Sequence, residues 1–436
     1  MDTVGILGRP VGRYRTRGLA AIVVLLLILS ACGSGGGTAS SGSGDGGSDT
    51  PAAETSQGVT DDAIKIGVHG PFSGNAAIYS KAQHMAIALY KERNEQGGIN
   101  GRQIEIVEAD DACDATTMQG VIRKFAQQDQ VFMIHGGSCS NAVIASKPLI
   151  EELQIPFLSV NAASGTISNP PLRNLFQPKP TADEIGAAVA AFADSTGLGT
   201  VGIVAQSDEW GQTSVDPAKA ALPETSLEVV ADEQIDPETG DTTPQVRKLL
   251  SAAPDVGIVF AYPAPMSVFL RDAAAQGLDV PFITGDGARP DEQFGRIGDR
   301  DAADNLFSAY TYTAPLDDPA FDKYRELLEQ YYPNDEFDGV ALEGAISAEL
   351  NMQILEAMGD ELTWDNWIAT AERSDGYSTE VGGPMQFLPF DPEDPRARRP
   401  GMEINFSALD PAKDDASIVV IKSWSDWEEL SASASR

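Results

Sequence analysis

The chain has 436 residues, 42% of them hydrophobic and 22% charged, which is a composition typical of soluble globular proteins. At roughly 100–200 residues per domain, this length predicts two or three folding units. Lysine and arginine number 30 against 65 aspartates and glutamates, and the formal charge of −35 should repel nucleic acid and anionic lipid surfaces. We therefore expect no nucleic-acid partner. A solvated acidic surface explains the charge without a cationic ligand.

The amino-terminal segment has the pattern of a secretion signal. Arginines between positions 9 and 17 precede an apolar run from Leu19 to Leu29, which is shorter than the roughly 20 residues of a membrane-spanning helix. The sequence Leu29-Ser30-Ala31-Cys32 resembles a bacterial lipobox. We predict a lipoprotein signal peptide over 1–31 and lipid attachment at Cys32, with a stop-transfer helix as the alternative. Residues 32–60 are rich in glycine and serine, which predicts a flexible linker.

The chain contains three cysteines. If lipidation consumes Cys32, then Cys113 and Cys139 remain as a pair in an exported, oxidising environment, where disulfides persist. We expect these two to form a disulfide, and the alternative is two buried free thiols. The histidines show no metal-site spacing, so we expect no metal and no cofactor.

From Ile64 onward, short apolar strands alternate with helices. Period-two alternation predicts a strand over Ile64 to Val68, and apolar residues at helical spacing predict a helix over Ser80 to Glu95. The alternation starts again after Pro178. Further strands are expected at 104–107, 131–134, 156–160, 201–205, 227–231, 256–260 and 281–284, and helices at 117–128, 142–153 and 182–194. This order predicts an α/β fold of two lobes, each a mostly parallel sheet flanked by helices.

Several strand-to-helix turns carry small, hydroxyl, aromatic or acidic residues, and ligands of parallel α/β sheets bind outside the carboxyl ends of the strands. These turns are 70–79, 136–140, 161–165, 262–265 and 284–287. Ser140 and Ser164 begin predicted helices, whose free N–H groups suit a carboxylate, and Asp286 would suit an ammonium group. Alternatively, the serines are plain helix caps and Asp286 belongs to an ordinary turn.

Four segments give the chain a resemblance to a known family. They are Ile64 to Val68, Phe72-Ser73-Gly74, Gln96 to Gly101 and Asp110 to Asp114. At these residues the chain resembles the leucine-, isoleucine- and valine-binding proteins of bacterial importers, and the resemblance runs from about Ile64 to Trp424. It implies the two-lobed type I periplasmic binding protein fold with three interlobe crossings. Lobe 1 would comprise 61–177 and 308–394, and lobe 2 would comprise 178–307 and 395–436.

The resemblance also implies a ligand site. Serine and threonine hydroxyls with nearby amides hold the ligand carboxylate in that family, and these positions correspond here to Ser140, Ala162, Ala163 and Ser164. A tyrosine and an acidic residue of the second lobe correspond to Tyr262 and Asp286. Further aromatic positions at the cleft fall on Tyr79 and Trp210. The paired cysteines of the family flank the first-lobe part of this site.

Three residues depart from the family pattern. Glu343 follows Leu342 where relatives commonly place an aromatic residue, Asn161 replaces a usual proline, and Asp286 is one methylene shorter than the family glutamate. The role of Glu343 is not indicated by the sequence. The charged, proline-rich stretch 389–400 is expected to be a solvated insertion.

The resemblance implies a solute-binding lipoprotein of an ABC importer, anchored by lipid alone at the extracytoplasmic face of the cell membrane. It implies a branched-chain or other neutral amino acid as ligand, and ABC permease subunits with cytoplasmic ATPases as partners of a monomer. The alternatives are small amides, urea or carboxylates as ligands, or a ligand sensor without transport. We expect no enzyme, because serine-hydrolase, zinc-protease and phosphate-loop motifs are missing. The glycine pattern of 197–202 enters a strand and so lacks the dinucleotide-binding context.

Overall fold

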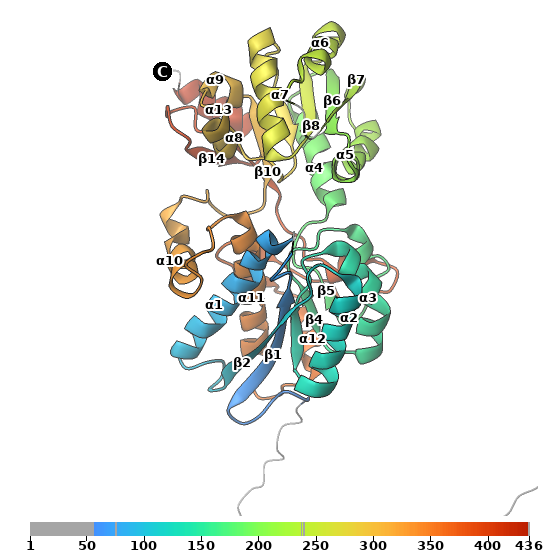
Figure 1. Ribbon diagram of the computed structural model, residues 1–436, viewed down its shortest axis with the longest axis vertical. Coiled ribbons are helices and arrows are strands. Elements are labelled where there is room, and N and C mark those ends of the chain that lie inside the picture. The colour runs from blue at the N-terminus through green and yellow to red at the C-terminus, as the bar shows by residue number, and fades with distance from the viewer. Residues whose placement is uncertain (1–55, 75, 237, 239, 435–436) are drawn as a thin grey trace, which may run out of the picture. The chain divides into compact units, whose positions relative to one another are not determined.

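The computed structural model describes residues 56–434 except 75, 237 and 239, and describes only the backbone of 209–210 (Figure 1). The predicted signal peptide, Cys32 and most of the predicted linker lie outside the described residues. The described chain forms two large sheets with flanking helices and one small hairpin. The predicted α/β organisation with mostly parallel sheets is therefore confirmed.

The first sheet has five parallel strands in the order β2-β1-β3-β4-β5. The strands are β1 (Ala63–Gly70), β2 (Gln103–Asp110), β3 (Met133–Gly136), β4 (Phe157–Ser159) and β5 (Leu175–Phe176). Successive side chains of a strand point to opposite faces. Met133 and Leu158 accordingly belong to one buried cluster, and Ile134 and Phe157 belong to another. Both faces of this sheet are thus covered, as expected for parallel strands.

Helices form the two layers around this sheet. They are α1 (Ser80–Glu95), α2 (Ala115–Lys124), α3 (Ser140–Leu153), α10 (Asp322–Tyr331), α11 (Gly339–Ala357) and α12 (Trp364–Ala371), and the hairpin is β11 (Tyr377–Thr379) with β12 (Gly383–Met385). Helix α1 packs closely on α11, and a Cβ atom at Gly344 would overlap the carbonyl of Ala82. Helix α2 begins two residues before the predicted start because the Asp114 side chain accepts a hydrogen bond from the Thr117 amide.

The second sheet has seven strands in the order β14-β13-β10-β9-β8-β6-β7. They are β6 (Thr200–Gln206), β7 (Glu228–Ile235), β8 (Val256–Phe260), β9 (Phe282–Thr284), β10 (Leu306–Tyr310), β13 (Asn405–Leu409) and β14 (Ile418–Ile421). Strands β13 and β14 run antiparallel to their neighbours, and the others are parallel. The helices around this sheet are α4 (Ala182–Ser195), α5 (Glu209–Ala221), α6 (Thr243–Ala252), α7 (Pro263–Gln276), α8 (Pro290–Ile297), α9 (Arg300–Ala303) and α13 (Trp424–Ala434).

We call the parts of the chain built on the first and second sheets lobe 1 and lobe 2. The described chain passes between the sheets after β5, after β10 and before β13. The boundary expected between 307 and 308 falls inside β10, whose residues pair with β9 and β13. Sheet pairing therefore places the second crossing beyond Tyr310. The other lobe boundaries remain our interpretation of the sequence.

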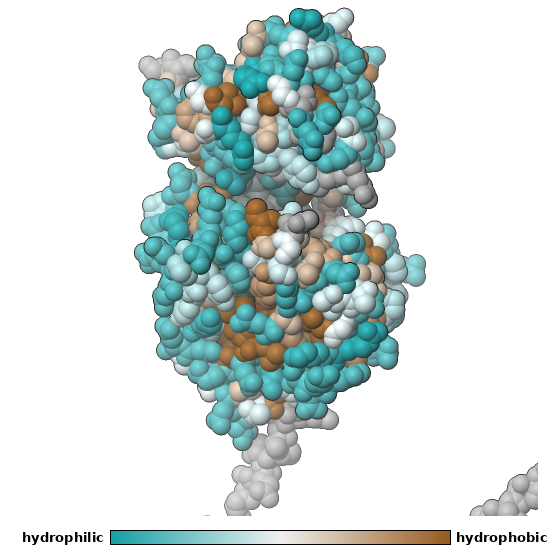
Figure 2. Space-filling model, in the orientation of Figure 1, coloured by the Kyte–Doolittle hydropathy of each residue, from teal (hydrophilic) through white to brown (hydrophobic). Residues whose placement is uncertain are grey.

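Most of the surface seen in Figure 2 is hydrophilic, with small apolar patches. This agrees with the excess of acidic residues, which keeps a protein solvated.

The expectation that 389–400 is a solvated insertion is wrong for its last part. A short 3-10 helix, η6 (Pro395–Arg398), buries Ala397 and Arg398 completely. The Arg398 guanidinium donates hydrogen bonds to the carbonyls of Leu172 (3.0 Å) and Arg173 (2.9 Å) and pairs with Glu372 at 2.7 Å. An arginine can enter the interior only with such partners. The sequence of 389–400 suggested a solvated loop because it is charged and rich in proline. It does not reveal that Leu172, Arg173 and Glu372, which are distant in sequence, contact Arg398.

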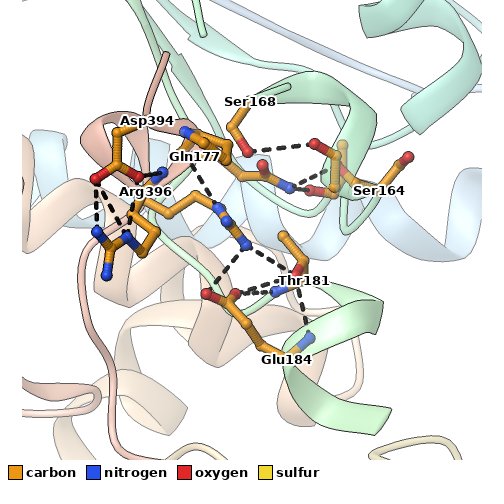
Figure 3. A network of polar contacts seen from close by, with 11 residues as sticks. Ser164, Ser168, Gln177, Thr181, Glu184, Asp394 and Arg396 are labelled. Carbon is orange, nitrogen blue, oxygen red and sulfur yellow. Dashed lines mark hydrogen bonds and ion pairs between the residues drawn. The ribbon is translucent and has the colours of Figure 1, made fainter. Parts of the chain in front are cut away.

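A polar network ties the first crossing to the third (Figure 3). The backbone amide of Gln177 donates a hydrogen bond to the backbone carbonyl of Arg398 at 2.9 Å. Arg399 pairs with Glu184 at 3.0 Å and donates to the Thr181 hydroxyl at 3.1 Å. Thr181 and Glu184 also form the capping box that begins α4. The start of α4 is thereby fixed to the segment that leads into β13.

We predict that Arg398→Met lowers the free energy of unfolding by about 3–5 kcal/mol, because it leaves Glu372 and two carbonyls without their buried partner. Arg396 lies on the same turn but its side chain is 71% exposed and pairs with Asp394. Arg396→Met should leave stability nearly unchanged, since exposed pairs contribute little. Urea unfolding followed by circular dichroism measures both variants. Similar losses in the two would contradict the prediction.

Candidate ligand-binding site

The turns singled out in the sequence line one cavity of about 660 Å³. Lobe 1 contributes Tyr79, Ser140 and Ala163, and lobe 2 contributes Tyr262 and Asp286. Each of these residues follows the carboxyl end of a strand in its sheet. This is the edge at which parallel α/β sheets bind ligands.

The disulfide predicted between Cys113 and Cys139 is present, with Cα atoms 5.5 Å apart. It joins the turn after β2 to the turn after β3, and Cys139 lines the cavity. The Asp111 carboxylate reinforces this edge, because it accepts from the Cys113 amide at 2.9 Å and contacts His69 Nδ1 at 2.7 Å. The backbone of the first-lobe wall is therefore fixed by covalent and polar links.

Hydroxyl groups form part of that wall. Ser138 is buried and accepts a hydrogen bond from Gln83 Nε2 at 2.8 Å. Ser140 is the first residue of α3, and its Oγ accepts from the Ser164 amide at 3.2 Å. Among the described residues, the Ser140 hydroxyl donates to no acceptor and the Ala163 amide makes no hydrogen bond. Both can therefore donate to a ligand carboxylate.

Two predicted site residues do not line this cavity. Ala162 is buried, and its carbonyl accepts from Gln177 Nε2 at 2.7 Å. Ser164 caps the short helix η3 (Gly165–Ile167) by accepting from the Thr166 amide at 3.3 Å. Ser164 instead lines a neighbouring cavity of about 570 Å³, which shares Ser140, Ala163, Asp286 and Gly287 with the first. Ala162 and Ser164 thus shape the turn that carries Ala163.

Tyrosines from both lobes face the cavity. Tyr79 is 41% exposed and Tyr262 is 40% exposed, high values for such large side chains. Burial raises the pKa of Tyr262, and nearby Tyr79 and Asp208 raise it further. The Tyr79 phenol in lobe 1 therefore influences the ionisation of the Tyr262 phenol in lobe 2. The side chain of Trp210, also expected at the cleft, lies outside the described part of the structure.

Sequence reasoning missed a buried ion pair in the cavity wall. Lys179 Nζ lies 2.8 Å from Glu343 Oε1, and Asn161 Nδ2 donates to Glu343 Oε2 at 2.5 Å. Burial opposes the charge of Lys179, but Glu343 and Asp286 outweigh it and raise its pKa. Burial also raises the pKa of Glu343, an effect that Lys179 reduces. In the sequence, Glu343 and Asn161 stood out as departures from the family pattern. No motif or spacing in the sequence around Lys179 indicated that it belongs to the site.

The other charged groups of the cavity differ in how they are paired. Asp338 pairs with Lys81 at 2.5 Å, and Arg289 pairs with Asp291 at 3.2 Å. Asp286 is exposed and has no ion pair or hydrogen bond to any described residue. Of the carboxylates that line the cavity, Asp286 alone is thus available to a ligand cation among the described residues.

The profile of a family described as "Periplasmic binding protein" matches residues 63–402. The chain belongs to the periplasmic binding protein family. The type I fold with two lobes, expected from the sequence, is thereby confirmed. None of the helices in 56–434 combines the length and apolar character that crossing a membrane requires.

Individual proteins resemble the chain at low identity. The chain is 25% identical to an amino acid binding protein of Pseudomonas aeruginosa. The matched segment covers 52% of this chain and 62% of that relative, so less than two thirds of the relative is spanned. A binding protein of Desulfitobacterium hafniense, solved with leucine, has a TM-score of 0.62 at 18% identity, covering 83% of this chain and all of that one. A fatty acid ABC transporter substrate-binding protein of Thermomonospora curvata has a TM-score of 0.62 at 22% identity, covering 85% and 94%.

We predict that Lys179→Met lowers the free energy of unfolding by about 3–5 kcal/mol at neutral pH, because it leaves the Glu343 carboxylate buried without a cation. The loss of Lys179 should also raise the pKa of Glu343 further. A carboxyl with a raised folded pKa favours folding when protonated, so the deficit should shrink as pH falls through that pKa.

Urea unfolding between pH 4 and pH 8 measures this dependence. Lys422 forms an exposed pair with Glu403 at 2.5 Å, with side chains 68% and 53% exposed, and Lys422→Met is the matched control. The control should show little loss at any pH. A deficit of Lys179→Met that stays constant over the whole range would contradict the assignment to Glu343.

Proposed function

We propose that this protein is the extracytoplasmic solute-binding lipoprotein of an ABC importer. We further propose that it binds a branched-chain or other neutral amino acid by closing its two lobes. Asp286, a lobe 2 carboxylate without an ion pair or hydrogen bond among the described residues, carries this proposal because it lines the same cavity as the Ser140 hydroxyl and Ala163 of lobe 1. An amino-acid zwitterion offers its ammonium group to Asp286 and its carboxylate to Ser140 and Ala163. Each charged end then favours the closed state, in which both lobes contact the ligand.

The tyrosines support lobe closure around a small molecule. Tyr79 and Tyr262 come from different lobes and are about two-fifths exposed, so a ligand between them would bury aromatic surface on both sides. The burial of aromatic side chains contributes strongly to binding. Nothing in this arrangement provides a nucleophile beside a base, and we propose binding without catalysis.

The partners follow from the same proposal. The lipobox-like sequence at Cys32 supports a lipid anchor as the only attachment to the membrane. The loaded monomer would deliver its ligand to permease subunits driven by cytoplasmic ATPases. Carboxylates without an amine are the second candidate ligands, because Lys179 and Arg289 also line the cavity and a structural neighbour is named as a fatty acid transporter protein.

Asp286→Ala should weaken amino-acid binding at least tenfold, because charge-assisted hydrogen bonds contribute about 1.5–3 kcal/mol each and the variant leaves the ammonium unpaired. Ser140→Ala should weaken binding less, since it removes a neutral donor. Isothermal titration calorimetry with amino acids, amides and carboxylates measures both.

Asp414→Ala, which removes an exposed carboxylate outside the cavity, is the control and should bind like the unaltered protein. If the tightest ligand lacks an amine, or if Asp286→Ala binds as tightly as its parent, the amino-acid assignment fails.

Cys32→Ser should release the protein from the membrane fraction, because it removes the thiol that carries the lipid. Two or more acyl chains hold a protein stably at a membrane, whereas one holds it only marginally. Cell fractionation and intact-mass measurement test this, with Cys113→Ser as a variant that keeps the anchor. An uncleaved, unmodified amino terminus in the parent protein would refute lipidation.

A further inference from the structure

The Lys179–Glu343 pair is built into the wall of the binding cavity from three separate parts of the chain. Lys179 belongs to the first crossing, Glu343 to α11, and Asn161 to the turn after β4. The side chains of Lys179 and Glu343 are only 12% and 14% exposed. The pair therefore presents a polar, partly desolvated surface to whatever occupies the cavity.

One residue of this wall, Asn161, carries an unused hydrogen-bond acceptor just behind the surface. Asn161 Nδ2 donates to Glu343, which fixes the amide orientation and turns Oδ1 away from the carboxylate. Asn161 Oδ1 is buried and has no hydrogen-bond partner among the described residues. Buried polar atoms are normally paired, and an unpaired one is costly. A ligand N–H or O–H that reached this oxygen would remove the cost.

The charges around the cavity limit what else the ligand can carry. The Lys179–Glu343, Lys81–Asp338 and Arg289–Asp291 pairs are each neutral overall. Asp286 leaves one negative charge, which the ammonium of an amino acid would balance. The ligand carboxylate would then lie on neutral donors. With the ligand carboxylate bound, site and ligand together keep one negative charge, so an anionic side chain would add a second buried charge without a counter-ion, which is expensive.

We propose that Lys179, Glu343 and Asn161 select an amino acid with an uncharged hydrogen-bonding side chain, a hydroxyl or a carboxamide, over aliphatic ones. This proposal rests on the proposed function, because it takes the ammonium to lie at Asp286. An aliphatic side chain would displace water from the three polar groups and offer no hydrogen bond in return. Sites built to hydrogen-bond a substrate group reject analogues that lack the group by large factors.

Calorimetry of the purified protein with serine, threonine, asparagine and glutamine against alanine, valine, leucine and isoleucine tests the preference. We expect at least one of the first four to bind tenfold or more tightly than each of the second four. The double variant Lys179→Met/Glu343→Leu replaces the pair with apolar groups of similar volume, a change that buried pairs often tolerate. It should lose the polar preference and gain affinity for leucine.

The double variant Lys422→Met/Glu403→Leu removes an exposed Lys–Glu pair outside the cavity and should keep the preference. Thermal unfolding of both double variants shows whether they are folded, and Asn161→Ala, which should weaken polar ligands at least threefold, gives an independent readout. Tightest binding of valine, leucine or isoleucine by the parent protein, or a polar preference retained by Lys179→Met/Glu343→Leu, overturns this inference and leaves the proposed function intact. Tightest binding of a ligand without an amine overturns the proposed function instead.

Discussion

Parallel strand pairing is the constraint on which the candidate ligand-binding cavity depends. Strands β1, β3 and β4 run in the same direction in lobe 1, as do β8 and β9 in lobe 2, so the turns that follow them lie at one edge of each sheet. Residues far apart in sequence thereby share a cavity. The Cys113–Cys139 disulfide and the contacts of Asp111 then hold the first-lobe edge in place. A cavity wall fixed before the ligand arrives loses less conformational entropy on binding.

The pairing of charged groups decides which charge this cavity can offer to a ligand. Its cations Lys179 and Arg289 each have an acidic partner, whereas the carboxylate of Asp286 has no ion-pair partner among the described residues. A buried ion pair is weak evidence for stability, because desolvation offsets the attraction between the charges. Lys179 and Glu343 lie in the wall of a cavity rather than in a sheet core, and our proposal that they take part in recognition rests on this position. Arg398 is the contrasting case, since its guanidinium is enclosed by protein partners at a crossing.

The sequence predicted the positions of strands and helices better than it predicted the lobe boundaries and which residues are buried. Strand β8 was predicted at the residues it occupies, 256–260, because a continuous apolar run between turn residues is a strong local signal. The boundary near 307 was misplaced because no strand was predicted over 306–310, so the boundary divided β10, which pairs with β9 and β13. The stretch 389–400 was misjudged because burial of Arg398 depends on Leu172, Arg173 and Glu372, which are distant in sequence.

Local periodicity, turn chemistry and cysteine count predicted the parallel α/β organisation, the disulfide and the turns that line the cavity. The first and the last depend on neighbouring residues, and the disulfide has one possible pairing once Cys32 is set aside as the predicted lipidation site. Only the tertiary structure decided that Ala162 and Ser164 shape the turn while Ala163 lines the cavity. It also decided that Lys179 meets Glu343 across 164 positions and that Asn161 meets Glu343 across 182. Such pairs form when the folded backbone brings distant segments together, and no local pattern in a single sequence records them.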